Sequence, residues 1–326
     1  MRLLITGCGS IGRRHARNLR ALGDHDLLLH DVAEDRWRAA AAEAGGGGSG
    51  DLEALLAMEP RAVLVCTPPH LHTAAARRAL EAGAHLFIEK PIAHSLDGVD
   101  ALLEAAAARG RVVLVGYSLR FEAGLRRAKD LVDGGAVGRV LALRAEFGQY
   151  LPDWRPAQDY RANYTARRAE GGGIILDGSH EIDYVRWLAG EIQAVSCTAG
   201  RLSDLDMDAE DMAALTLRLA GGAIAEVHLD CVQRGYARSC KIIGDRGTLV
   251  WDLREGVCLL AAGETAWKTF PAAADVNAMY LDEMRHFLAC VRDGAKPLVD
   301  GYAGRRVLEI ALAAHRAAAL RAEVPV

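Results

Sequence analysis

Three side chains of this sequence have the types and the spacing that proton transfer requires. Asp177 and His180 stand three residues apart, so a helix that begins near Asp177 presents both on one face. An imidazole titrates near neutrality, which suits His180 to the role of a general base, while Asp177 would orient the substrate or tune the imidazole. Lys90 follows an apolar run and precedes a proline, and its ammonium group could stabilise a developing oxyanion. The reverse assignment, with Lys90 as the base, stays open.

Each of these residues also has a structural interpretation. Lys90 could be a surface lysine in a loop, and His180 a histidine of the core. Asp183 continues the predicted helical face, where it could orient His180 or pair with Arg186. His15, in an earlier helical stretch, is expected on a solvated face rather than in a site.

The N-terminal residues 1–12 carry a glycine fingerprint in the order strand, turn and helix. Gly7 allows the tight turn, Gly9 lets the backbone approach a pyrophosphate, and Gly12 lets the helix pack closely on its strand. The N-terminus of that helix faces the phosphate charge. A second apolar run ends at Asp31, about twenty residues on, where a ribose-binding carboxylate is expected. The sequence therefore predicts a dinucleotide site.

Asp31 also selects between the two nicotinamide dinucleotides. A carboxylate holds the ribose hydroxyls and repels a 2′-phosphate, so NAD is the expected cofactor rather than NADP. Arg36, in the helix that follows, could soften this preference.

The next two strands bring further residues to the same site. The apolar runs 62–66 and 85–88 are typical of buried parallel strands. In a doubly wound sheet the ligand crevice lies outside the carboxyl ends of the strands, so Thr67 and the turn 89–91 are expected beside a cofactor. The expected cofactor contacts are Gly7, Gly9, Ser10, Ile11, Gly12, Asp31, Thr67, Pro68, His72, Glu89 and Lys90.

The second half of the chain has the pattern of a mostly antiparallel sheet with helices. Alternation is clear at Ala214, Thr216 and Arg218, as in a strand with one buried face. Strands are expected over 139–147, 194–198, 213–219, 223–229, 239–243 and 248–253, and helices over 122–132, 275–291 and 302–322. The predicted fold class is therefore α/β, with a doubly wound parallel sheet followed by a second sheet domain.

A long segment, 150–170, is rich in tyrosine, tryptophan and arginine and is predicted to be an ordered loop. Loops of this length in compact domains are often functional. Aromatic rings can stack on sugar faces and arginines can grip a carboxylate or phosphate, whereas a surface or interface loop with balanced charges is the alternative. The expected substrate contacts are Lys90, Tyr117, Arg120, Trp154, Arg155, Tyr164, Asp177 and His180.

Composition is that of an ordinary globular protein and excludes several classes. The 326 residues allow two domains, and 51% of them are hydrophobic. The net charge of −4 argues against nucleic-acid binding, and no apolar run approaches the ~20 residues of a membrane span. We expect no signal peptide, because residues 1–5 already form the first strand. The seven cysteines are scattered without a CxxC pair, so we expect reduced thiols in a cytoplasmic protein and no metal site.

Several motifs stand together in a family-specific order. They are GCGSIG with Asp31, CTPPHLH (66–72), EKP (89–91), GYSLRF (116–121) and GGGIILDGSHEID (171–183). Their order and spacing resemble the glucose–fructose oxidoreductase, inositol dehydrogenase and rhizopine-catabolism family, written Gfo/Idh/MocA. The resemblance extends over essentially the whole chain.

The resemblance implies an NAD-binding Rossmann domain over 1–120 and an α/β domain with a large, open, mostly antiparallel sheet over 121–326. It implies hydride transfer between a sugar or cyclitol hydroxyl and a nicotinamide cofactor. It also implies a homodimer or homotetramer formed through the second sheet. Two features depart from the family: the glycine run 45–48 replaces the short third strand, and His180 follows the acid by three positions rather than four.

Two functions of other classes stay open. The chain could bind NAD for transient oxidation during glycoside cleavage, or it could be a catalytically silent sensor of a sugar or cofactor. The presence of Lys90, Asp177 and His180 together favours an enzyme, because a sensor has no need of a base. The arginine-rich loop favours an acidic or nucleotide-linked sugar, while the stretch 180–183 resembles inositol dehydrogenases.

Overall fold

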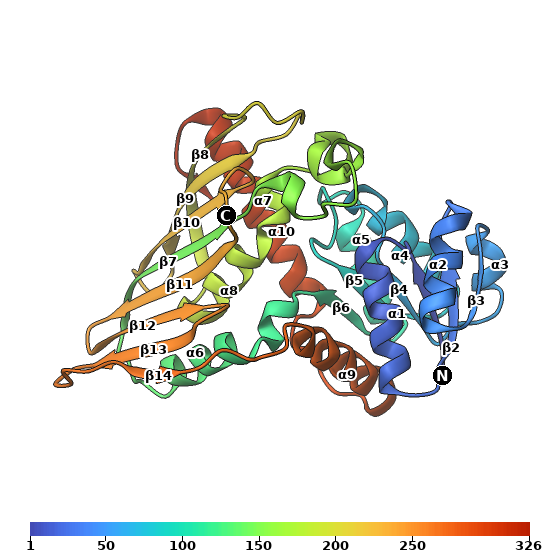
Figure 1. Ribbon diagram of the computed structural model, residues 1–326, viewed down its shortest axis with the longest axis horizontal. Coiled ribbons are helices and arrows are strands. Elements are labelled where there is room, and N and C mark those ends of the chain that lie inside the picture. Colours follow the sequence, from blue (N-terminus) through green and yellow to red (C-terminus); the bar gives the residue numbers. More distant parts are fainter. The chain divides into compact units, whose positions relative to one another are not determined.

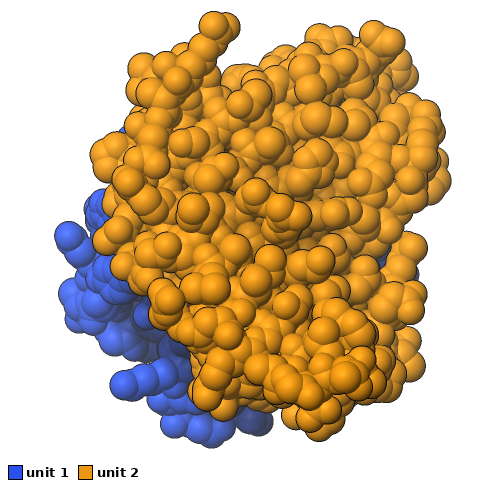
Figure 2. Space-filling view, turned by 90° about the vertical axis from the view of Figure 1, so that its left-hand side faces the viewer, with its two compact units in different colours: residues 1–118, 277–308 blue, residues 119–276, 309–326 orange.

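The computed structural model describes all 326 residues, which form two compact units. Unit 1 comprises residues 1–118 and 277–308, and unit 2 comprises 119–276 and 309–326, coloured blue and orange in Figure 2. The first boundary lies two residues from the expected division at 120. The structure differs from that division in the segment 277–308. This segment belongs to unit 1, because its helix packs into the hydrophobic core of the first sheet.

Unit 1 is built on a six-stranded parallel sheet with the order β3-β2-β1-β4-β5-β6. The strands are β1 (Arg2–Thr6), β2 (Asp26–His30), β3 (Gly47–Ser49), β4 (Ala62–Val65), β5 (His85–Glu89) and β6 (Val113–Gly116). This order reverses between β1 and β4, as in dinucleotide-binding sheets. The central strands are buried on both faces, which explains their continuous apolar runs. The predicted parallel sheet is confirmed.

Helices flank this sheet on both sides (Figure 1). They are α1 (Ser10–Leu22), α2 (Glu34–Ala44), α3 (Leu52–Leu56), α4 (His72–Glu81), α5 (Val99–Ala108) and α9 (Asn277–Asp293). α9 comes from the far end of the chain and lies beside α1, where Phe287 packs edge-on against Phe87 of β5 at 5.6 Å between ring centroids.

The expectation that the glycine run replaces the third strand is wrong. β3 forms within that run and pairs with β2 in parallel register. A Cβ at Gly48 would lie 2.5 Å from the Trp37 ring and 2.6 Å from the carbonyl oxygen of Leu29. Glycine is therefore required here because Trp37, from α2, covers the strand closely.

Unit 2 is built on a nine-stranded sheet with the order β14-β13-β12-β11-β7-β10-β9-β8-β15. Its strands are β7 (Val140–Gly148), β8 (Ile192–Gly200), β9 (Met212–Leu219), β10 (Ile224–Asp230), β11 (Ala237–Gly244), β12 (Gly247–Asp252), β13 (Gly256–Ala261), β14 (Lys268–Phe270) and β15 (Val324–Pro325). Only the β7–β10 pair is parallel, so the sheet is mostly antiparallel, as expected. Sequence analysis did not predict β13 to β15; β14 and β15 are too short for periodicity to reveal.

The helices of unit 2 cover one face of this sheet (Figure 1). They are α6 (Ala123–Asp133), α7 (Ile174–Asp177), α8 (Ser179–Ala189) and the C-terminal part of α10 (Gly301–Leu320). Along β9 the buried residues Leu215 and Leu217 alternate with Thr216 and Arg218, which lie on the other, uncovered face. None of the helices combines the length and the apolarity that a bilayer crossing needs.

Candidate active site

The glycine turn after β1 has the geometry of a dinucleotide-binding loop. Gly7 has a φ of +92°, and a Cβ there would lie 2.5 Å from the backbone of Cys66. A Cβ at Gly12 would lie 1.9 Å from the carbonyl oxygen of Gly7, so the helix and the turn are in contact through both glycines. A Cβ at Gly9 would meet no atom within 4 Å. The open space over Gly9 is the cradle that a pyrophosphate needs.

The first turn of α1 offers backbone donors to an anion at this cradle. Gly9 is the N-cap residue and provides no side-chain cap, and the first helical bond runs from Arg13 N to Gly9 O at 3.0 Å. The N–H groups of Ser10, Ile11 and Gly12 therefore have no partner inside the helix. Together with the positive end of the helix dipole they favour a bound phosphate.

Asp31 stands directly after β2 and ties the glycine turn to that strand. Its Oδ2 accepts a hydrogen bond from the Cys8 N–H at 2.9 Å, and its Oδ1 accepts one from the Ala33 N–H at 3.0 Å. Each carboxylate oxygen keeps a second lone pair that a ribose hydroxyl could use. The next residue, Val32, is 87% exposed, and its apolar side chain has no hydrogen-bond donor for a 2′-phosphate. The local chemistry therefore fits NAD.

After β4, Thr67 and His72 have different roles. The Thr67 Oγ1 is buried and has no protein partner. The His72 ring is buried, with Nε2 2.7 Å from the Thr67 carbonyl oxygen and Nδ1 3.0 Å from that of Pro91. Both ring nitrogens thus face backbone within unit 1, so His72 braces two loops, and its expected contact with a cofactor stays a prediction.

The turn after β5 carries Lys90 and is fixed through the preceding glutamate. Glu89 Oε1 lies 2.6 Å from Nε2 of His15, and Glu89 Oε2 accepts the Lys90 N–H at 3.2 Å. The expectation that His15 lies on a solvated face is wrong, because its side chain is fully buried against Phe87. His15 therefore anchors the residue that directly precedes Lys90.

Sequence analysis also missed Glu283 of α9, a fully buried carboxyl group. Neither of its oxygens has a hydrogen-bond partner. Burial, and then the charge of Glu89, raise the pKa of Glu283 well above its usual value. Both effects favour the neutral form of this carboxyl group. The sequence signal is weak, since a glutamate on an amphipathic helix usually faces solvent.

In unit 2, Tyr164 and Asp177 are brought together as expected for residues of one site. The Tyr164 hydroxyl donates to Asp177 Oδ1 at 2.7 Å. Asp177 and His180 are 5% and 8% exposed. Both side chains are therefore largely shielded from water in unit 2, as an acid–base centre requires.

Asp177 and His180 do not share one helix, which corrects the predicted geometry. α7 ends at Asp177, and α8 begins at Ser179, after Gly178. A Cβ at Gly178 would lie 2.8 Å from both the Ile174 carbonyl oxygen and the Leu229 side chain. Glycine is required between the two helices because the close approach of Leu229 of β10 leaves no room for a side chain.

Two expected substrate contacts, Tyr117 and Arg120, are buried in this structure. Arg120 forms a bidentate ion pair with Asp183, both bonds measuring 2.8 Å, and is 7% exposed. Asp183 thus neither pairs with Arg186, which binds Glu191, nor is left to orient His180. Tyr117 is fully buried.

The loop arginines are mostly neutralised within the loop. Arg161 pairs with Asp159, and Arg167 with Glu170. Arg168 lies 3.7 Å from Glu210, while Arg155 forms no ion pair with any residue of the chain.

Trp154 serves the loop's own structure in part. Its indole N–H donates to the Gln149 carbonyl oxygen at 2.9 Å, and its ring packs on Phe147 at 5.7 Å between centroids. Of the expected substrate contacts in this loop, Arg155 has a guanidinium group outside any ion pair, and Tyr164 binds Asp177.

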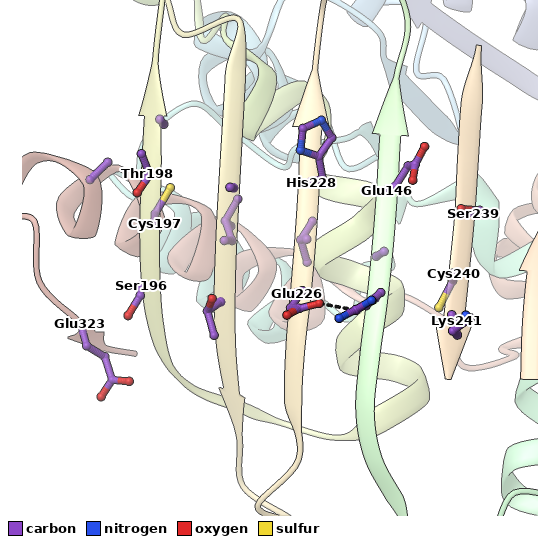
Figure 3. Close-up of a pocket in the computed structure, with 18 of the residues that line it drawn as sticks. Glu146, Ser196, Cys197, Thr198, Glu226, His228, Ser239, Cys240, Lys241 and Glu323 are labelled. Carbon is purple, nitrogen blue, oxygen red and sulfur yellow. Dashed lines mark ion pairs between the residues drawn. The ribbon is translucent and has the colours of Figure 1, made fainter. Parts of the chain in front are cut away.

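A separate hollow lies on the uncovered face of the nine-stranded sheet (Figure 3). It has a volume of about 1190 Å³ and is lined by β7 to β12 strands together with the chain segment that follows α10. Its floor is polar, with the ion pair of Arg144 and Glu226 at 2.5 Å and the side chains of Glu146 and His228 (Figure 3). None of the predicted catalytic residues lines it.

Comparison with known proteins identifies both halves of the chain. Residues 1–117 match the family model of the oxidoreductase family with an NAD-binding Rossmann fold, and residues 125–250 match the model of the GFO/IDH/MocA C-terminal domain. Myo-inositol 2-dehydrogenase of Thermotoga maritima is 28% identical over 97% of this chain and 96% of its own length. Inositol 2-dehydrogenase 3 of Saccharopolyspora erythraea is 29% identical over 94% and 90%. The crystal structure of GenD2 from gentamicin A biosynthesis, in complex with NAD, is 26% identical, covers 100% of this chain and 96% of that chain, and has a TM-score of 0.87.

Proposed function

Because the chain belongs to the Gfo/Idh/MocA family and is an NAD-dependent dehydrogenase of sugar or cyclitol hydroxyl groups, we propose that His180 is its general base and that Lys90 stabilises the alkoxide. When bound, NAD supplies the acceptor for the hydride that leaves the substrate carbon. The imidazole of His180 takes the proton of the same hydroxyl group, so the two transfers together yield a carbonyl. The ammonium group of Lys90 lowers the energy of the negative oxygen that forms between them.

The observation that carries this proposal is the hydrogen bond between Tyr164 and the buried Asp177. The hydrogen bond of 2.7 Å fixes the Asp177 carboxylate next to the turn that bears His180. Asp177 then orients the substrate or the imidazole, and Tyr164 keeps its carboxylate in one position. Proton transfer requires such positioning within hydrogen-bond distance of the hydroxyl group.

The cofactor is held by this chain's own backbone and one carboxylate. The open space over Gly9 and the free N–H groups of the first turn of α1 bind the pyrophosphate, and Asp31 binds the ribose. Glu89, anchored by His15, keeps the Lys90 backbone fixed beside the bound dinucleotide.

A cyclitol is the proposed substrate class. Support comes from the two relatives named above, which are inositol 2-dehydrogenases and match over nearly the full length. An acidic or nucleotide-linked sugar is the second candidate, and Arg155 favours it, because its guanidinium group is not neutralised by the chain.

A substrate screen tests this proposal. Purified protein is mixed with NAD and, in turn, with inositols, other polyols, uronic acids and nucleotide sugars, and NADH formation is followed by absorbance. We expect the highest kcat/KM with an inositol. A preference for uronic or nucleotide sugars that is lost in Arg155→Ala would favour the second candidate, and no NADH formation from any of them would refute the proposed function.

We further propose that the chain forms a homodimer or homotetramer through the open face of its nine-stranded sheet. The polar hollow there is a face that no helix of unit 2 covers (Figure 3). An isologous contact would bury it on both copies. Light scattering should give a multiple of the 34.9 kDa chain mass, and Thr216→Arg should reduce it to one chain, whereas Ala108→Arg on α5 should not. A monomeric wild type would refute this.

We propose that the protein is located in the cytoplasm. All seven cysteines are free thiols, and five of them are buried. Reduced thiols persist in the reducing compartments of the cell. Retention of the protein in the cytoplasmic fraction, measured by cell fractionation, tests this assignment.

A further inference from the structure

Glu210, which directly precedes Asp211 and β9, is a buried carboxylate with partners from three other parts of unit 2. It is 4% exposed. Its Oε1 accepts the Ile175 N–H at 3.2 Å and lies 3.0 Å from Nε2 of His315 on α10. Its Oε2 lies 3.7 Å from the guanidinium group of Arg168. One side chain thus connects α7, α10 and the loop before α7.

The contact with α7 replaces a missing helix cap. Gly173 is the N-cap residue of α7 and has no side chain that could accept the first N–H groups. Glu210 satisfies two of them, since its carbonyl oxygen accepts the Ile174 N–H at 3.0 Å and its carboxylate accepts that of Ile175. Capping of this kind fixes the position of the first turn. Because α7 has only four residues, fixing its start also fixes Asp177 at its end.

The glycines of the segment 171–173 allow this arrangement. Gly173 has a φ of +105°, and a Cβ there would lie 2.3 Å from Glu210 Oε1. A Cβ at Gly172 would lie 2.2 Å from the Tyr164 carbonyl oxygen. Any side chain at either position would push away the capping carboxylate or the tyrosine segment. The glycines therefore serve the approach of Glu210 to α7.

His315 keeps Glu210 in its ionised form. Burial alone would raise the pKa of Glu210, but the hydrogen bond and the charge of His315, with the N–H groups of Glu210 itself and of Ile175, lower it below its usual value. A charged carboxylate is a stronger acceptor for the α7 N–H groups than a neutral one. The α10 helix thereby contributes to the position of α7 although His315 does not contact it directly.

We propose that Glu210, held by His315, is a positioning residue that sets α7 and thereby the Asp177 carboxylate and the His180 imidazole for proton transfer. Glu210 itself touches neither the substrate nor the cofactor. This inference rests on the proposed function, because it assigns Asp177 and His180 to the reaction. It adds two residues to those expected from the sequence: Glu210, which precedes β9, and His315 of α10.

The first experiment measures how firmly α7 is held and needs no substrate turnover. Hydrogen exchange of residues 172–180 is compared in the wild type, Glu210→Ala, Glu210→Gln and His315→Gln. We expect faster exchange of the Ile175 amide in Glu210→Ala, because its acceptor is the Glu210 carboxylate, and nearly wild-type exchange in Glu210→Gln, whose amide oxygen can still accept. Unchanged exchange in Glu210→Ala would overturn the proposal.

The matched control is Glu191→Gln. Glu191 also binds an arginine, Arg186, at 2.7 Å and a backbone N–H, that of Ile192, at 3.3 Å, but it lies beyond the other end of α8. Its substitution should leave exchange of residues 172–180 at the wild-type level.

The second arm measures turnover with the best substrate of the screen. In Glu210→Ala we expect kcat to fall about 100-fold, the scale of a misplacement of about 1 Å, with the KM for NAD unchanged. Glu210→Gln should recover most of this loss, and Glu191→Gln should have wild-type kcat. A wild-type kcat in Glu210→Ala would overturn the proposal, since a purely structural role would change stability but not kcat. If the wild type oxidises no substrate, the proposed function fails, while the exchange arm still decides whether Glu210 sets α7.

Discussion

The hydroxyl group of Tyr164 donates a hydrogen bond of 2.7 Å to the Oδ1 of Asp177. The donor comes from the aromatic loop and the acceptor from the end of α7, so this bond joins the two segments from which the sequence predicts substrate contacts and catalysis. Asp177 is nearly buried, and the bond fixes the position of its Oδ1. The roles of Asp177, His180 and Lys90 stay predictions, and the following experiments test them.

Tyr164→Phe removes the donor and keeps the ring. A hydrogen bond to a charged group contributes about 1.5–3 kcal/mol, so we expect kcat/KM to fall by about 10- to 100-fold. Steady-state kinetics measures this loss. Tyr150→Phe is the control, because Tyr150 lies in the same loop and its ring packs under Arg234. Equal losses in the two variants would mean that the loop, and not the bond to Asp177, is affected.

Lys90→Met removes the ammonium group and keeps much of the side-chain length. Loss of a group that stabilises a developing oxyanion costs about 10²–10³ in kcat. NAD affinity should stay near the wild-type value, since the pyrophosphate and ribose contacts belong to the glycine turn and Asp31. Fluorescence titration with NADH and steady-state kinetics separate the two effects, with Lys129→Met on the surface of α6 as the control. Full activity in Lys90→Met would contradict the assignment.

The wild type should bind NADH more tightly than NADPH. Asp31→Asn should weaken NADH binding by about 10-fold or more, because a charged acceptor for the ribose hydroxyls is lost, and it should narrow the gap to NADPH. Titration of both reduced dinucleotides measures this. Since Asp31 also accepts the Cys8 N–H, the thermal midpoint of the variant must be compared with that of the wild type. Tighter binding of NADPH by the wild type would refute the preference.

Glu283→Gln should stabilise the protein increasingly as the pH rises. The pKa of Glu283 in the folded chain is raised above the usual value of 4.5, so its favourable contribution is fully present below that value and is lost as the pH rises toward the folded-state pKa. Glutamine does not titrate. The difference in unfolding free energy, variant minus wild type, should therefore grow by about 1.4 kcal/mol per pH unit over that window.

Urea unfolding at several pH values measures this difference. Glu104→Gln is the control, because Glu104 is exposed on α5 of the same unit and should give a difference that is independent of pH. A flat difference for Glu283→Gln as well would show that the buried acid ionises freely in the folded chain.

The features that could be predicted from the sequence are those whose partners lie nearby in the chain. The glycine turn is one, because Gly7 and Gly12 contact each other within a single turn and helix start. The alternation along β9 is another, since a strand with one buried face shows it residue by residue. Both sheets and the family were confirmed for this reason.

The features that could not be predicted are pairings between distant residues. His15 meets Glu89 across 74 positions, Arg120 meets Asp183 across 63, and His315 meets Glu210 across 105. Nothing in the local pattern distinguishes these charged residues from those of a solvated helix face. The need for glycine at position 178 also depends on β10, which follows some fifty residues later.

The sequence by itself determined the parallel sheet and the NAD cradle, because local backbone requirements and periodicity encode them. The tertiary structure alone decided which charges are engaged in ion pairs and which remain for a ligand. In the folded chain Arg120 pairs with Asp183, Glu210 caps α7, and Arg155 forms no ion pair. The physical reason is that a buried charge must find a partner, and only the packed chain shows which partner lies within reach.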